Sequence, residues 1–87
     1  MRNNDVLKKQ IIYRSSHRGI KEMDLLLGNF VNKYINKFNY QELNDLYEIL
    51  EMDDDKIFKW YLDKNNNDSI PNTKVSTLLK KFKINKL

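Results

Sequence analysis

The sequence predicts an all-α fold, a compact bundle of about five short helices. Five segments repeat apolar residues at steps of three and four, and no segment shows the alternation typical of a strand. Residues that cap helices stand ahead of most of these segments. A chain of 87 residues with 40% apolar side chains can bury one modest core, so we expect a single domain over residues 1–87.

We expect the first two helices to meet at the stretch RSSHRGIKEMD. Asp5 is the predicted cap of the first helix, whose apolar pattern fades at residues 15–16. The second helix should extend from near Gly19 to Phe38, and its regular apolar stripe predicts that it forms the spine of the core. Gly28 lies inside this helix and costs about 1 kcal/mol relative to alanine, which indicates a close helix crossing or a small bend.

The last three helices have recognisable starts. Asn39, with Glu42 three residues later, forms a capping box for the third helix. The carboxylates of Asp53–Asp55 favour the start of a fourth helix, because the N-terminal end of a helix carries a partial positive charge. Its aromatic residues 60–61 are expected in the core and at its rim. A polar loop then leads to a cap at residues 72–73 and to a last helix.

Composition excludes several classes of protein. The chain has no cysteine, so it has no disulfide and no thiolate zinc site. The longest apolar run is Leu25–Leu27, far below the roughly 20 residues of a membrane-spanning helix, so we expect no membrane insertion. The N-terminus lacks the features of a signal or transit peptide. We therefore expect the chain to stay in the compartment in which it is made, which is the cytoplasm for a bacterial protein, and we expect it to be a monomer.

No set of residues has the spacing of a catalytic or metal site. Residues 63–74 space oxygen ligands like an EF-hand loop, but Lys74 stands where the closing glutamate belongs, so we predict a polar turn. The side chains of Asp53–Asp55 would point in different directions around a helix and could not converge on one ion. His17 is the only histidine and lacks companions for a metal site or a catalytic triad. We therefore expect neither enzyme activity nor a bound metal.

The stretch RSSHRGIKEMD remains unusually charged for a helix boundary. If the second helix begins near Gly19, Arg18 and Glu22 are four residues apart on one face, with Lys21 and Asp24 beside them. An exposed ion pair at a capped helix start would explain this pattern and would contribute only 0 to about 1 kcal/mol. The glycine between the charges favours another interpretation, because it lets a second backbone approach closely. A charged patch with a bare centre suits docking to a partner.

At these residues the chain resembles a known family. Arg18-Gly19-Ile20-Lys21-Glu22 matches the RGxxE signature of the SdhE flavinylation factors, whose mitochondrial members are succinate dehydrogenase assembly factors. The stretches HRGIKEMDLLLGNF, LEMDD and WYL are similar to family features in the same order, so the resemblance covers residues 6–82. The lysine-rich end, residues 80–87, is less similar and is not assigned to the interface.

The resemblance implies a small helical protein that is not an enzyme. Such proteins bind the flavoprotein subunit of succinate dehydrogenase, and in some bacteria that of fumarate reductase, and promote covalent attachment of FAD to a histidine of that subunit. FAD is then the cofactor of the client, and no cofactor is bound stably by the factor itself. Arg18, Gly19 and Glu22 would form the centre of the docking surface, with Asp24 beside it and His17 at its edge. Arg18 and Glu22 would make charge-assisted bonds to the client.

The net charge of +4 leaves a second hypothesis, a small basic helical nucleic-acid-binding protein. That protein would use Lys80, Lys81 and Lys83, and its binding would weaken steeply with salt. Binding of a flavoprotein would instead depend on Gly19 and Glu22. We expect the flavoprotein partner and no nucleic acid.

Overall fold

Five helices make up the part of the chain that the computed structural model describes, residues 4–63 and 69–83, and no strand occurs in it. The all-α prediction is therefore confirmed. The helices are α1 (Asn4–Ser15), α2 (Lys21–Tyr34), α3 (Tyr40–Leu50), α4 (Asp54–Leu62) and α5 (Lys74–Lys81). None of these helices is long and apolar enough to span a membrane.

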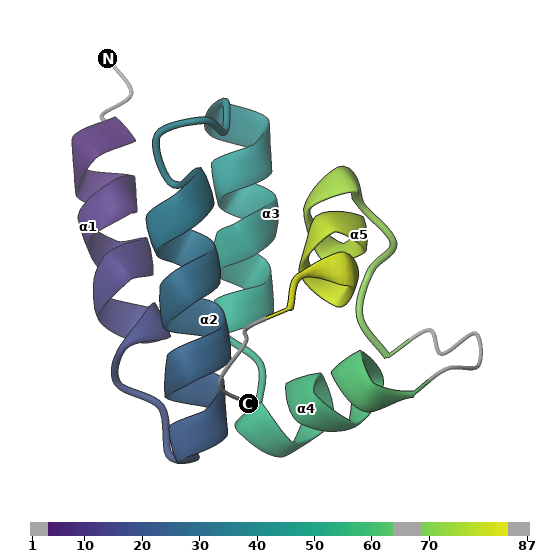
Figure 1. Ribbon diagram of the computed structural model, residues 1–87. Helices are drawn as coiled ribbons and strands as arrows, with labels where there is room; N and C mark the ends of the chain where they lie inside the picture. Colours follow the sequence, from purple (N-terminus) through teal and green to yellow (C-terminus); the bar gives the residue numbers. More distant parts are fainter. Residues whose placement is uncertain (1–3, 64–68, 84–87) are drawn as a thin grey trace.

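The first three helices stand side by side and alternate in direction (Figure 1). Helix α1 packs against both α2 and α3, and α3 packs in turn against α5. Helix α4 runs across the end of the bundle at which α1 gives way to α2 (Figure 1). The connection between α1 and α2 therefore lies at the same end of the molecule as the connection between α3 and α4.

Helix α2 is the spine of the core, as its apolar stripe predicts. It contributes five buried side chains, and all the other helices pack apolar side chains into the same cluster. Trp60 of α4 is 5% exposed, which confirms the expected core position of that ring. The largest fully buried side chains of the cluster are Phe30, Ile11, Met23, Leu26, Leu27, Leu43, Leu46, Leu50, Ile57, Leu79, Val31 and Val75.

Two helix starts are capped as the sequence predicts. The Asn39 side chain accepts a hydrogen bond from the Glu42 backbone N–H (2.8 Å), and the Glu42 carboxylate accepts one from the Asn39 N–H (2.9 Å). At α5, Thr73 and Ser76 form the same reciprocal box. The hydrogen bond from the Asn39 backbone, together with Lys74 at 3.2 Å, lowers the pKa of the Glu42 carboxyl below its ordinary value.

Polar contacts of the aromatic residues Trp60 and Tyr61 link α4 to α5 and to the residue that follows it. The Tyr61 hydroxyl donates to the Phe82 carbonyl, and burial raises the pKa of that hydroxyl. The Lys80 ammonium donates to the Trp60 carbonyl (2.7 Å) and lies 4.8 Å from the centre of the indole ring. Lys80 is thus used inside the fold, although the nucleic-acid hypothesis required it at the surface.

Two expectations about helix ends need correction. Helix α1 already includes Asn4, so Asp5 lies in its first turn and not ahead of it. Helix α2 ends at Tyr34, yet Phe38 is still buried because the connecting turn carries its ring back against the Tyr34 ring, 5.3 Å away. The apolar stripe thus extends beyond the end of α2 into the turn that follows it.

The remaining expectations concern Gly28 and the polar loop. A Cβ atom at Gly28 would lie 4.0 Å from the Ser15 carbonyl, an ordinary contact, so the helices do not cross there more closely than an alanine would allow. Most of the polar loop predicted after α4, residues 64–68, lies outside the described residues.

Candidate functional site

The candidate docking residues lie at the junction of α1 and α2. Residues 16–20 connect the two helices, and Ile20 occupies the N-cap position of α2 with an extended backbone. The structure brings all the sequence-predicted residues together at this junction, but it divides them by exposure. His17, Gly19 and Glu22 are exposed, whereas Arg18 and Asp24 are half-buried.

Arg18 is directed inward, and its side chain is only 8% exposed. Its Nε donates to Asp54 (2.5 Å), and its Nη2 donates to the Met52 carbonyl (2.9 Å). Its Nη1 reaches the carbonyls of Leu50 (2.6 Å) and Arg14 (3.2 Å). The guanidinium therefore satisfies the carbonyls left open where α1 and α3 end, and it links those ends to the first residue of α4.

Asp54 receives three hydrogen bonds from the connection between α1 and α2. Besides Arg18 Nε, the backbone N–H groups of Gly19 (2.8 Å) and Ile20 (3.2 Å) donate to its second oxygen. A second carboxylate also holds this connection, because Asp24 accepts a hydrogen bond from the Arg18 backbone N–H (2.7 Å). The backbone N–H groups of residues 18, 19 and 20 are thus all bonded to a carboxylate, Asp24 for the first and Asp54 for the other two.

This network corrects the predicted pairing within the motif. Arg18 precedes α2 and does not share a helical face with Glu22, because the helix begins two residues later than expected, at Lys21. Its ion partner is Asp54, which is 36 residues away in the sequence. Glu22 is exposed and makes no ion pair among the described residues.

Asp54 also changes the interpretation of the acidic run. The sequence predicts Asp53–Asp55 as an N-terminal cap of α4, and Asp53 does occupy the N-cap position, but its side chain makes no capping hydrogen bond. Asp55 pairs with Lys59 one turn later, at 3.2 Å. Asp54 is the residue that sequence reasoning missed as part of the site. The acidic stretch is one of the family-like segments, but nothing in the sequence distinguishes Asp54 from the aspartates beside it.

The fold itself does not require a glycine at position 19. No described glycine has a positive φ, and a Cβ atom at Gly19 would lie 3.7 Å from the Asp54 carboxylate, an ordinary contact. An alanine would therefore fit the isolated chain. Gly19 is exposed, and apart from its chain neighbours the Asp54 carboxylate is the only group of the described residues within 4 Å of the position that a Cβ would occupy, so the backbone here is open to close approach by another chain.

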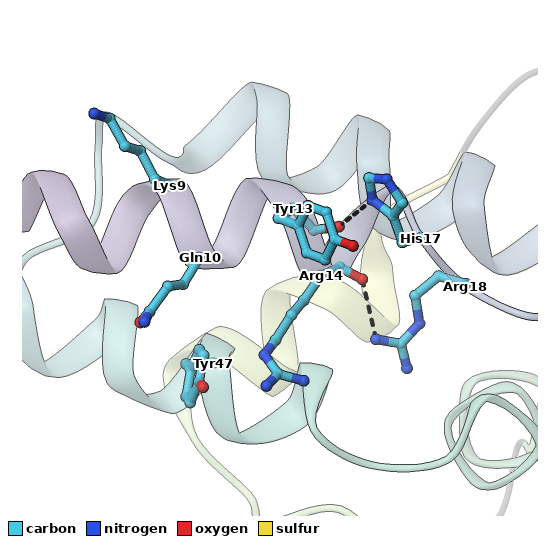
Figure 2. A pocket seen from close by; sticks show the side chains of 7 residues that line it. All are labelled: Lys9, Gln10, Tyr13, Arg14, His17, Arg18 and Tyr47. Atoms are coloured by element: carbon cyan, nitrogen blue, oxygen red, sulfur yellow. Dashed lines mark hydrogen bonds between the residues drawn. The ribbon is translucent and has the colours of Figure 1, made fainter.

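A cleft of about 430 Å³ opens beside this junction, between α1 and α3 (Figure 2). The His17 ring stacks on the Tyr13 ring, with the centres 3.9 Å apart, and its Nδ1 lies 2.7 Å from the Tyr13 carbonyl. Because a carbonyl can only accept, Nδ1 carries the proton in this contact. The residues lining the cleft are Lys9, Gln10, Tyr13, Arg14, His17, Arg18 and Tyr47.

The site offers binding groups more than reactive ones. No cluster of three or more histidine, cysteine or carboxylate side chains suited to a metal occurs within residues 4–63 and 69–83. The side chain of Arg18 is committed to helix ends and to Asp54. What the junction presents outward is a rigid backbone, one carboxylate and the aromatic and basic cleft.

Comparison with known proteins identifies relatives of this chain. Residues 9–83 match the family Sdh5, described as flavinator of succinate dehydrogenase. The chain is 39% identical over 67 residues to succinate dehydrogenase assembly factor 2, mitochondrial, of Dictyostelium discoideum, covering 71% of this chain and 48% of the relative. The proteins of the same name from Debaryomyces hansenii and Saccharomyces cerevisiae are 33% and 36% identical, with 94% and 98% of this chain covered.

The chain spans 48% to 61% of the length of these three relatives. The family match, in contrast, extends over nearly all of the chain and includes the whole α1–α2 junction and Asp54. Nothing in these comparisons points to nucleic-acid binding. The chain belongs to the Sdh5 family, the flavinators of succinate dehydrogenase.

Proposed function

We propose that this chain binds the flavoprotein subunit of succinate dehydrogenase and promotes the covalent attachment of FAD to it. Membership of the Sdh5 family supports this activity, and so do the names of the relatives. Fumarate reductase is a possible second client in a bacterial source. A eukaryotic source would place the protein in the mitochondrial matrix, in keeping with the names of the relatives, and a bacterial source in the cytoplasm.

The observation that carries the proposal is the presentation of Gly19. Its backbone N–H is held by Asp54, while the residue itself is exposed and carries no side chain that would keep a partner backbone away. A loop that is already rigid loses little conformational entropy when a partner binds, so more of the contact energy appears as affinity. Gly19 and Glu22 then contact the client, with His17 at the edge, and Arg18 and Asp24 act as positioning residues.

The chemistry in this proposal belongs to the client and its flavin. Covalent attachment needs the client's histidine and the isoalloxazine ring held in reactive geometry, and correct placement alone can account for a large rate effect. The factor would stabilise that arrangement as a monomer, with no stably bound cofactor and no catalytic residue of its own.

Replacement of Gly19 by arginine tests this assignment. We expect Gly19→Arg to abolish capture of the purified flavoprotein subunit and to reduce its covalent flavin, measured by in-gel fluorescence, while the circular dichroism spectrum stays helical. Asn32→Arg is a matched control, because it adds the same side chain at an exposed position nearer the other end of α2. Normal capture and flavinylation by Gly19→Arg would contradict the assignment.

A further inference from the structure

The cleft between α1 and α3 carries chemistry that the RGxxE motif does not describe. We propose that it receives an acidic segment of the client, with an Asp or Glu carboxylate on the Arg14 guanidinium and a neighbouring apolar side chain against Tyr13 and Tyr47. This inference rests on the proposed function and adds a second contact region to the Gly19 surface.

The charges around the cleft favour an anionic occupant. Lys9 and Arg14 supply two cationic groups, and none of the lining residues is acidic. Arg18 also lines the cleft but is paired with Asp54. Arg14 is instead paired with Glu51 at 3.6 Å, and the side chains of that pair are 44% and 49% exposed. Exposed pairs of this kind contribute little, so the Arg14 guanidinium can exchange this partner for a carboxylate of the client at small cost.

The aromatic side chains favour a peptide over a small inorganic anion. Tyr13 is 62% exposed, an unusual position for a ring on a helix that also faces the core. The Arg14 guanidinium lies 5.3 Å from the centre of the Tyr47 ring on the opposite wall. Figure 2 shows the guanidinium of Arg14 directed toward Tyr47, so cationic and aromatic surfaces adjoin. A carboxylate with an apolar neighbour matches both surfaces.

The cleft is also preorganised and continuous with the docking residues. Arg18 donates to the Arg14 carbonyl, which ties the end of α1 to the network around Asp54. His17 lines the cleft and lies two residues from Gly19. A single extended stretch of the client could therefore contact Gly19 and then enter the cleft.

Charge reversal in the cleft tests this inference. We expect Arg14→Glu and Lys9→Glu each to weaken binding of the purified flavoprotein subunit by about 10-fold or more, and to reduce its dependence on salt. Lys81→Glu is the matched control, because it changes the net charge equally on α5, across α3 from the cleft. Equal affinities of Arg14→Glu, Lys9→Glu and Lys81→Glu would overturn the inference.

A photo-crosslinking amino acid at Tyr47 identifies the occupant directly. We expect the crosslinked client peptide to contain Asp or Glu next to an apolar residue. A crosslinked peptide without a carboxylate would overturn the inference, as would Arg14-dependent binding of a single-stranded oligonucleotide with client binding unchanged.

The two proposals fail in different ways. If Gly19→Arg abolishes client binding while the cleft variants bind normally, the proposed function stands and the acidic segment does not occupy the cleft. If the unaltered chain does not bind the flavoprotein at all, both proposals are wrong.

Discussion

At the scale of single residues, the motif has one residue that supports the loop and others that are exposed. Arg18 supports the loop through its pair with Asp54, whereas Gly19 and Glu22 are exposed. The side chains of Arg18 and Asp54 are 8% and 12% exposed, so the pair is almost buried, and each partner has further hydrogen bonds that compensate for lost hydration. Because Arg18 is used inside the fold, under the proposed function we expect a substitution there to lower client binding by changing the conformation of the loop. We expect a substitution at Glu22 to remove a direct contact with the client.

We predict that Arg18→Met lowers the free energy of unfolding by about 3 kcal/mol, because it removes the ion partner of Asp54, leaves Oδ1 of that carboxylate without its donor, and leaves three backbone carbonyls without theirs. Urea unfolding measures this change. Glu22→Gln is the control and should remain within about 0.5 kcal/mol of the unaltered chain, since its side chain is exposed. A loss below about 1 kcal/mol in Arg18→Met would show that the network does not support the fold.

At the scale of helices, the starts of α3 and α5 share one charged contact. Glu42 belongs to the capping box of α3, and Lys74, the first residue of α5, lies 3.2 Å from its carboxylate. The same carboxylate therefore stabilises one helix start and one contact between helices. Both interactions are stronger with its ionised form, which is why its pKa is lowered.

This lowered pKa predicts a dependence of stability on pH. The carboxyl of Glu42 is more acidic in the folded chain than its ordinary value of 4.5, so its contribution is present above that pH and is lost as the pH falls through the folded pKa. Glu42→Gln keeps a capping side chain but cannot titrate. We expect the unaltered chain to lose more stability than Glu42→Gln between pH 6 and pH 3, measured by thermal unfolding; equal losses would contradict the shift.

At the scale of the whole molecule, one apolar cluster holds all five described helices together. The buried residues of α1 to α5 belong to a single group, and the Cα radius of gyration is 12.3 Å. With 87 residues, of which 32% are charged, the chain can bury only a small core. We therefore expect a modest free energy of unfolding. An average of about 0.05–0.15 kcal/mol per residue corresponds to roughly 4–13 kcal/mol for this length.

A shared core predicts one cooperative unfolding transition. Trp60 reports on the α4 end of the cluster through its fluorescence, while far-ultraviolet circular dichroism reports on all the helices. We expect the two signals to give the same midpoint in urea. An earlier midpoint for Trp60 would show that α4 and α5 unfold separately from α1, α2 and α3.

The parts of the fold that local sequence determines were predictable. The capping boxes at Asn39 and Thr73 involve residues three apart, and the buried stripe of α2 follows from helical spacing. Phe38 shows the limit of that signal, because an apolar residue can continue a stripe from a turn. The spacing of apolar residues predicts which side chains are buried, but it does not show whether each one belongs to a helix or to a turn.

The candidate site was only partly predictable, for a different reason. The motif located the exposed residues, but the partner of Arg18 is 36 positions away, and nothing near Asp54 distinguishes it from its two acidic neighbours. Which of three adjacent carboxylates faces the loop depends on the angle at which α4 crosses the bundle. That angle is set by packing of the whole core and is not visible in local patterns.

The hold of Asp54 on Gly19 and Ile20 also links recognition to the order in which the chain becomes structured. The amides of the loop have their acceptor only after the chain through residue 54 has been made and α4 has been laid against the bundle. A nascent or truncated chain that ends before α4 would carry the complete RGxxE letters on a loop without its shape. The loop of the motif therefore takes its final conformation only after α4 is in place.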